Sequence, residues 1–88
     1  MQRVESGTPI NLTGSGAVSL TAGTLLGFYV NSTTAGTIVL RNGGAAGTVI
    51  SGTITPAIGF HAVRAYCTSG CYATIANTLD VTFFFSAG

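Results

Sequence analysis

The first property of this 88-residue sequence is how little charge it carries. It contains no lysine and no tryptophan, and only three arginines and two acidic residues, so charged residues make up 6% of the chain, against a typical share of about 25%. A net charge of +1 is too small for the six or so phosphate contacts that a nucleic-acid site typically needs. We therefore expect no nucleic-acid partner.

Long hydrophobic runs are absent as well. Although 47% of the residues are hydrophobic, Gly, Thr, Ser or Asn interrupts them every few positions, and no run approaches the ~18 residues of a membrane-spanning helix. Residues 1–7 also lack the apolar core of a secretory signal. We expect no membrane partner and expect synthesis in the cytoplasm, a reducing compartment.

Groups that carry out chemistry are equally scarce. His61 and Asp80 are the only residues of their types, and Glu5 is the only other carboxylate, so neither a nucleophile system nor a carboxylate pair is indicated. Cys67, Cys71 and His61 offer three metal ligands where a structural zinc site uses four. We expect no catalytic residue, no cofactor and no metal.

What the sequence does contain is β-structure. Segments rich in Val, Ile, Thr, Phe and Tyr recur between Gly, Asn, Ser or Pro residues, and no segment has the 3.6-residue period of an amphipathic helix. The pattern predicts an all-β fold, a single small antiparallel β-sandwich of jelly-roll or immunoglobulin-like type with about eight short strands. The expected strands are Thr8–Thr13, Ala17–Thr21, Leu25–Asn31, Gly36–Arg41, Thr48–Ile54, Gly59–Cys67, Cys71–Ile75 and Thr78–Ser86.

Alternation along these segments assigns residues to faces. The predicted core residues are Ile10, Leu12, Val18, Leu20, Leu26, Phe28, Val30, Leu79, Val81, Phe83 and Phe85. Tyr29 and Phe84 fall on the opposite faces, among Thr and Ser, and we expect them at partner contacts. In the expected strand Gly59–Cys67 neither set of alternating residues is clearly apolar, so the sequence does not show which set points into the core.

Residues 1–7 precede the first strand and contain Arg3 and Glu5, two of the five charges. We interpret them as an extended arm whose charged residues contact a partner, with the β-sandwich domain spanning residues 8–88. The two cysteines flank the three-residue loop Thr68-Ser69-Gly70, which would allow Cys67 and Cys71 to face each other at the ~5.5 Å Cα separation of a disulfide. Two free thiols are an equal alternative in a reducing compartment.

Size and composition together indicate an assembly. A chain this short buries only about 60–65% of the surface that its unfolded form exposes, and it has few charges with which to protect its surface and sheet edges. We therefore expect neighbouring proteins to cover much of the surface.

The whole chain, from Gly7 to Phe85, resembles a class of small virion proteins of tailed bacteriophages, the head decoration or cement proteins of cyanophages and similar phages. The similarity is carried by Leu25-Leu26-Gly27-Phe28-Tyr29-Val30, Ile38-Val39-Leu40-Arg41-Asn42-Gly43, Ser69-Gly70-Cys71-Tyr72-Ala73-Thr74-Ile75 and Leu79-Asp80-Val81-Thr82-Phe83-Phe84-Phe85.

The resemblance implies a non-enzymatic protein on the phage head surface, often a homotrimer, that binds the major capsid protein where its subunits meet and stabilises the shell. The alternative is a tail or head fibre, or a connector component, with a role in binding host-surface carbohydrate.

Overall fold

The computed structural model describes residues 8–87, and all of its secondary structure is antiparallel β-strand. The predicted all-β class is therefore confirmed. The six strands are β1 (Thr8–Leu12), β2 (Gly16–Ser19), β3 (Gly23–Asn42), β4 (Thr48–Val49), β5 (Gly59–Cys67) and β6 (Cys71–Ala87). No helix capable of crossing a membrane occurs in this part of the chain.

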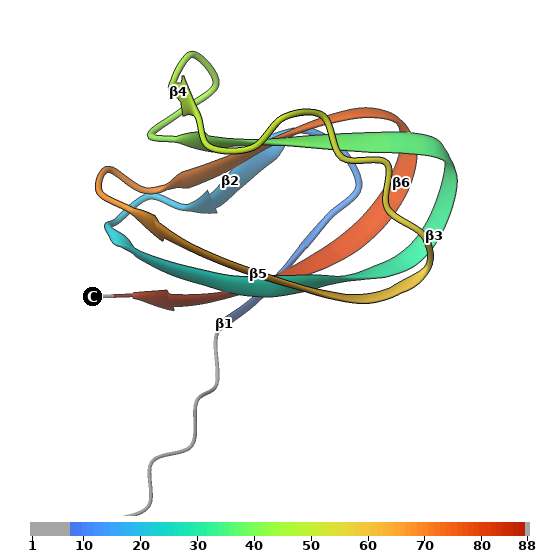
Figure 1. The fold of residues 1–88 in the computed structure, drawn as a ribbon, viewed down its shortest axis with the longest axis horizontal. Helices are drawn as coiled ribbons and strands as arrows, with labels where there is room; N and C mark the ends of the chain where they lie inside the picture. The colour runs from blue at the N-terminus through green and yellow to red at the C-terminus, as the bar shows by residue number, and fades with distance from the viewer. Residues whose placement is uncertain (1–7, 88) are drawn as a thin grey trace, which may run out of the picture.

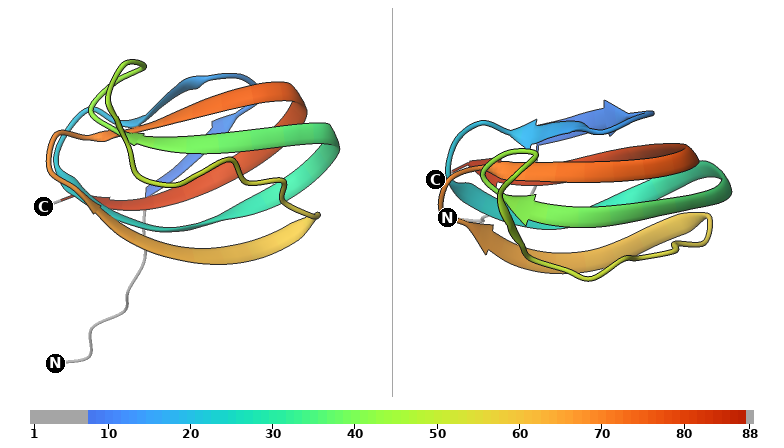
Figure 2. Two further views of the ribbon diagram at one scale, coloured as in Figure 1. Left: turned by 45° about the horizontal axis from the view of Figure 1, so that its top comes forward. Right: turned by 90° about the horizontal axis from the view of Figure 1, so that it is seen from above.

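The long strands β3 and β6 organise the molecule. They pair along their whole length, from Gly23 opposite Ala87 to Asn42 opposite Cys71, and this ribbon folds over on itself into two layers (Figures 1 and 2). In one layer β1 and β5 flank the ribbon, giving the order β1-β6-β3-β5; in the other, β2 and β4 flank it.

The prediction of about eight strands was wrong because pairs of predicted strands are continuous. β3 spans both Leu25–Asn31 and Gly36–Arg41, and β6 spans both Cys71–Ile75 and Thr78–Ser86. The predicted strand Thr48–Ile54 shrinks to β4 plus an isolated bridge between Ile54 and Ile38. Composition shows the turn-forming residues between the segments. It does not show that the chain bends there while its pairing with the neighbouring strand continues.

The bend depends on a few residues with unusual backbone conformations. Ala35 and Asn77 have φ angles of 57° and 63°, and Asn77 Nδ2 donates a 2.8 Å hydrogen bond to the carbonyl oxygen of Ala35. Next to them Gly36 is buried, and a Cβ there would lie 2.7 Å from Leu79 Cβ. These residues let both long strands pass from one layer to the other.

The hydrophobic core lies between the two layers. Phe28 and Phe83 lie at its centre, with ring centroids 5.6 Å apart, and each fully buried large side chain contributes about 1.5–3 kcal/mol. Of the predicted core residues, the buried ones are Val18, Phe28, Val30, Leu79, Val81, Phe83 and Phe85, while Ile10 and Leu12 are half-buried against them.

Two predicted core residues point outward. Leu20 follows the end of β2 and is 85% exposed. Leu26 lies at a β-bulge between Leu25 and Gly27, where an extra residue shifts the alternation, so that Leu25 is buried in its place. A bulge of this kind reverses a face assignment made from period-two alternation alone.

The alternation in β5 does not show which of its residues point into the core, whereas the structure does. His61, Val63, Ala65 and Cys67 point inward, and Phe60, Ala62, Arg64 and Tyr66 point outward. The larger aromatic residues of this strand, Phe60 and Tyr66, are thus on the solvent side.

Candidate interaction surface

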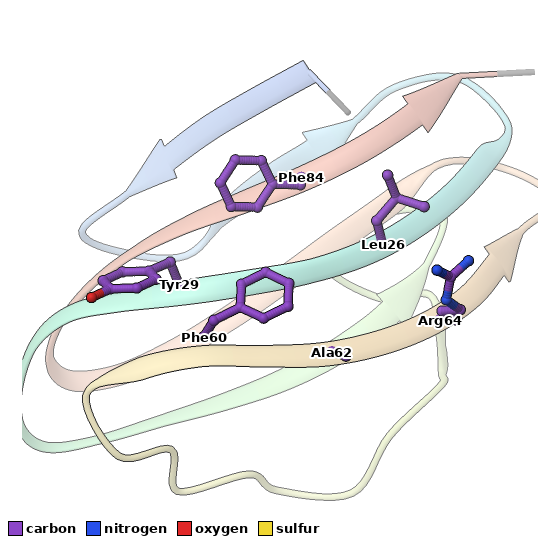
Figure 3. Close-up of a pocket in the computed structure, with 6 residues that line it drawn as sticks. All are labelled: Leu26, Tyr29, Phe60, Ala62, Arg64 and Phe84. Carbon is purple, nitrogen blue, oxygen red and sulfur yellow. The ribbon is translucent and has the colours of Figure 1, made fainter. Parts of the chain in front are cut away.

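The most unusual surface of the molecule is the outer face of the β1-β6-β3-β5 layer. A depression of about 380 Å³ on this face is lined by Leu26, Tyr29, Phe60, Ala62, Arg64 and Phe84 (Figure 3). We call its five uncharged members, Leu26, Tyr29, Phe60, Ala62 and Phe84, the aromatic patch. They come from three neighbouring strands, and Tyr29 and Phe60 are 43% and 57% exposed.

Strand register brings these side chains together. Phe84 on β6 pairs with Gly27 on β3, and Tyr29 pairs with Phe60 on β5. Gly27 has no side chain, and a Cβ there would lie 2.9 Å from Phe60 Cζ and 2.7 Å from the carbonyl oxygen of His61. The Phe60 ring can therefore lie over β3 and approach Phe84, with ring centroids 6.3 Å apart, within the range of a favourable aromatic pair.

Among the described residues, one charged side chain lies toward each end of this face. Arg64 lies beside Leu26, on the β5 segment whose Ala65 pairs with Leu25, and Asp80 on β6 pairs with Ser32 of β3. The seven-residue interval from Leu25 to Ser32 corresponds to about 23 Å along β3 at ~3.3 Å per residue. The third charged residue of residues 8–87, Arg41, belongs to the other layer, where it donates to Thr74 Oγ1 and the Gly47 carbonyl.

Asp80 is held in a small group of polar side chains, which we call the polar cluster: Asn11, Asn31, Asp80 and Thr82. Asp80 Oδ1 accepts hydrogen bonds from Asn11 Nδ2 at 2.7 Å and from Asn31 Nδ2 at 3.2 Å. Thr82 Oγ1 accepts from the same two amides at 3.2 Å. The carboxylate is therefore positioned before any partner arrives.

The predicted outward placement of Tyr29 and Phe84 agrees with the structure, and their role as partner contacts stays a prediction. Arg3 and Glu5, the other two predicted contacts, lie outside the described residues. Sequence reasoning missed Phe60, Leu26 and Arg64 as members of this face. Phe60 and Arg64 could have been found had the inner face of β5 been assignable, whereas no sequence signal marks the bulge at Leu26.

The cysteines lie away from this face, inside the molecule. Both are completely buried free thiols. Burial raises the pKa of both thiols, that of Cys71 to about 12, with a further contribution from the neighbouring Cys67. Because the reactive form of cysteine is the thiolate, neither side chain is a nucleophile near neutral pH.

His61 and Asp80 lie on opposite sides of their layer. His61 points inward, with its ring 5.3 Å from that of Phe28 and its Nε2 2.7 Å from the Ala57 carbonyl oxygen, whereas Asp80 belongs to the outer polar cluster. An acid–base pair needs the two groups within hydrogen-bonding reach. Within residues 8–87 there is also no group of three or more His, Cys, Asp or Glu side chains that could hold a metal ion.

Comparison of the chain with protein-family models, curated proteins and solved structures finds no match.

Proposed function

We propose that the chain is a non-enzymatic structural subunit that packs its outer face against other protein subunits, as a decoration protein on the head of a tailed bacteriophage. In this role it binds where major capsid subunits meet and stabilises the shell. The observation that carries the proposal is the aromatic patch, exposed on a molecule with almost no charge.

The patch has the composition of an interface centre. Aromatic residues and arginine are enriched at protein–protein interfaces, and other charged residues are depleted there. Phe60 and Tyr66 lie on the same strand and are 57% and 59% exposed. Exposed apolar surface of this kind promotes association with other proteins. A protein partner would remove this surface from water and provide a binding energy that scales with the area covered.

A non-enzymatic role is supported by the distribution of reactive groups. His61 and Asp80 face opposite ways, and the buried Cys67 and Cys71 thiols are protonated near neutral pH. On the outer face, the Asn11 and Asn31 amides are engaged in positioning Asp80.

Shell stabilisation follows from mass action. A protein that binds only the assembled state stabilises it by RT ln(1 + [L]/Kd), about 2.7 kcal/mol per copy when its concentration is a hundred times Kd. Because a shell has many equivalent junctions, even a modest affinity raises the resistance of the whole particle to heat and osmotic shock.

The test uses particles assembled without the chain. They are expected to package DNA but to break at lower temperature or under osmotic shock, and added purified protein should restore their resistance. Phe60→Ser should weaken binding to the particles, since it removes an exposed ring from the aromatic patch. Val49→Ser, which changes an exposed residue of β4 in the other layer, is the matched control. Unchanged resistance of deficient particles would exclude the shell-stabilising role.

A second candidate function, recognition of host-surface carbohydrate by a fibre or connector component, is favoured by one observation. The polar cluster adjoins the aromatic patch, since Thr82 pairs with Tyr29, and a ring beside amide and carboxylate groups can stack on a sugar and bond its hydroxyls. In that case deficient particles should withstand heat and osmotic shock normally but fail to adsorb to the host.

A further inference from the structure

We propose that Cys67 and Cys71 are a redox-sensitive pair. Their thiols close to a disulfide when the chain reacts with an oxidised thiol such as glutathione disulfide, and residues 68–70 control access to them. The structure shows the reduced form, in which both cysteines are free thiols. The inference goes beyond the proposed function and does not depend on it.

The two cysteines belong to different layers of the molecule. Cys67 ends β5 and pairs with Gly23, in the layer of β1 and β5. Cys71 begins β6 and pairs with Ser19 of β2, in the other layer. Residues 68–70 connect them at the end of the molecule opposite the bends of β3 and β6 (Figure 1). A disulfide would therefore add a direct covalent link between the layers at this end.

The thiols are close neighbours inside the core. Both side chains are 0% exposed and belong to the same hydrophobic cluster, and Cys67 is near enough to raise the pKa of the Cys71 thiol. A disulfide joins Cα atoms about 4.4–6.8 Å apart. A connection of three residues keeps the ends of the strands that it joins near this separation. The pair is thus placed for an intramolecular bond.

The connection between the cysteines is held closed by hydrogen bonds from the neighbouring turn. Asn42 Nδ2 donates to Thr68 Oγ1 at 2.9 Å, and the Ser69 N–H donates to Asn42 Oδ1 at 3.0 Å. The Gly43 N–H donates to the Gly70 carbonyl oxygen at 3.0 Å. Because the thiols are completely buried beneath this arrangement, an oxidant reaches them when the connection opens locally.

The reaction is thiol–disulfide exchange in two steps. One cysteine loses its proton to solvent, and its thiolate attacks a sulfur of glutathione disulfide. The S–S bond of glutathione breaks, one glutathione thiolate leaves and a mixed disulfide forms. The second cysteine, also deprotonated, attacks the protein sulfur and expels the other glutathione thiolate. The chain loses two electrons and two protons, and glutathione disulfide becomes two molecules of glutathione.

The test compares the folded chain with the urea-unfolded chain in glutathione redox buffers. Because the fold holds the two sulfurs together, the equilibrium constant for closing should be at least about tenfold larger in the folded chain. By linkage, the oxidised chain should unfold at a higher urea concentration than the reduced chain. Acid quenching, alkylation of the remaining thiols and mass spectrometry measure the closed fraction. A constant no larger in the folded chain, or mixed disulfides as the only product, would overturn the proposal.

The role of residues 68–70 is tested by the rate of closing. Asn42→Ala removes two of the hydrogen bonds that hold this connection and should speed closing in the folded chain about tenfold. Asn31→Ala, which removes hydrogen bonds to Asp80 and Thr82 on the outer face, is the matched control and should close at the wild-type rate. Urea midpoints of both variants separate local opening from a general loss of stability. Equal rates at equal stability would overturn the control of access by residues 68–70.

Two further controls complete the experiment. In a Cys67→Ser, Cys71→Ser double variant, glutathione disulfide should leave the mass and the urea midpoint unchanged. Phe60→Ser, which alters the aromatic patch, should close as the wild-type chain does, because the cysteines lie away from that face. Closing in a chain that fails to bind particles would keep the redox pair and remove the decoration role, and the reverse result would do the opposite.

Discussion

Gly27 is the residue on which the aromatic patch depends most directly. Its missing side chain leaves the space in which the Phe60 ring lies over β3, and the carbonyl oxygen of His61 is close on the neighbouring strand. Tight packing of this kind leaves no room for even one additional methyl group. The identity of a single glycine thus links strand pairing inside the layer to the shape of its outer surface.

Gly27→Ala is expected to reduce the free energy of unfolding by about 1–3 kcal/mol, because the added Cβ would lie 2.7 Å from a backbone oxygen that cannot move freely. Urea denaturation measures the change. Gly52→Ala is the control, since a Cβ at Gly52 meets nothing within 4 Å, and its effect should stay within about 0.5 kcal/mol. Equal stability of the two variants would show that the crowding at Gly27 is relieved at no cost.

The buried thiols predict an alkaline loss of stability. Their pKa values are raised above 9.0 in the folded state, that of Cys71 to about 12, so the unfolded chain releases these protons first. The contribution is complete below pH ~9 and is lost as the pH rises towards 12. The free energy of unfolding, measured by urea titration from pH 8 to 11, should fall less steeply in a Cys67→Ala, Cys71→Ala double variant. An identical slope would contradict this origin.

At the scale of elements, the long bent strands matter more than any turn. Because β3 and β6 each contribute to both layers, the two layers are joined through both strands at the bend and are held together by the core between them. The bend combines two register shifts in β3, at Val30/Ser32 and Thr34/Ala35, with the positive φ angles of Ala35 and Asn77. Such backbone angles are costly for most residues, whereas glycine and asparagine tolerate them.

Asn77→Val is expected to destabilise the protein by about 2 kcal/mol or more, because a β-branched residue strongly disfavours a φ of 63°. Asn77→Gly keeps the backbone angle accessible and loses only the hydrogen bond to Ala35, so its cost should be about 1 kcal/mol. Thermal denaturation followed by circular dichroism ranks the two. A valine variant as stable as the glycine variant would show that the bend tolerates a different backbone conformation.

At the scale of the whole molecule, the balance between a thin core and a poorly charged surface points to association. A monomer of this size has a small free energy of unfolding. An interface that forms only between folded chains would increase that free energy. Stability and self-association are then linked through protein concentration.

The melting temperature of the wild-type chain is therefore expected to rise with protein concentration, because the self-association we propose would stabilise the folded state by mass action. Phe60→Ser should melt at nearly the same temperature across a hundredfold dilution series, since it removes an exposed ring from the aromatic patch. Differential scanning calorimetry at several concentrations measures both. A wild-type melting temperature independent of concentration would argue against self-association of the folded chain.

Several features could be predicted from sequence because they depend on local pattern. Alternation in the C-terminal segment correctly placed Leu79, Val81, Phe83 and Phe85 inside, since period two is a direct consequence of strand geometry. The same rule failed at Leu26, where a bulge inserts an extra residue. In β5, the alternating residues that include Phe60 and Tyr66 are no less apolar than those that include Val63. The pattern therefore could not show which of the two sets points into the core.

By itself, the sequence determined the all-β class, the centre of the core and the scarcity of charge, because these follow from composition and from the two-residue repeat of a strand. Only the tertiary structure decided that eight segments become six strands and that Gly27 admits the Phe60 ring. It also placed Arg64 and Asp80 toward opposite ends of one face. Those outcomes depend on register, bulges and backbone bends, which are set by packing between residues far apart in the chain and leave little trace in local sequence.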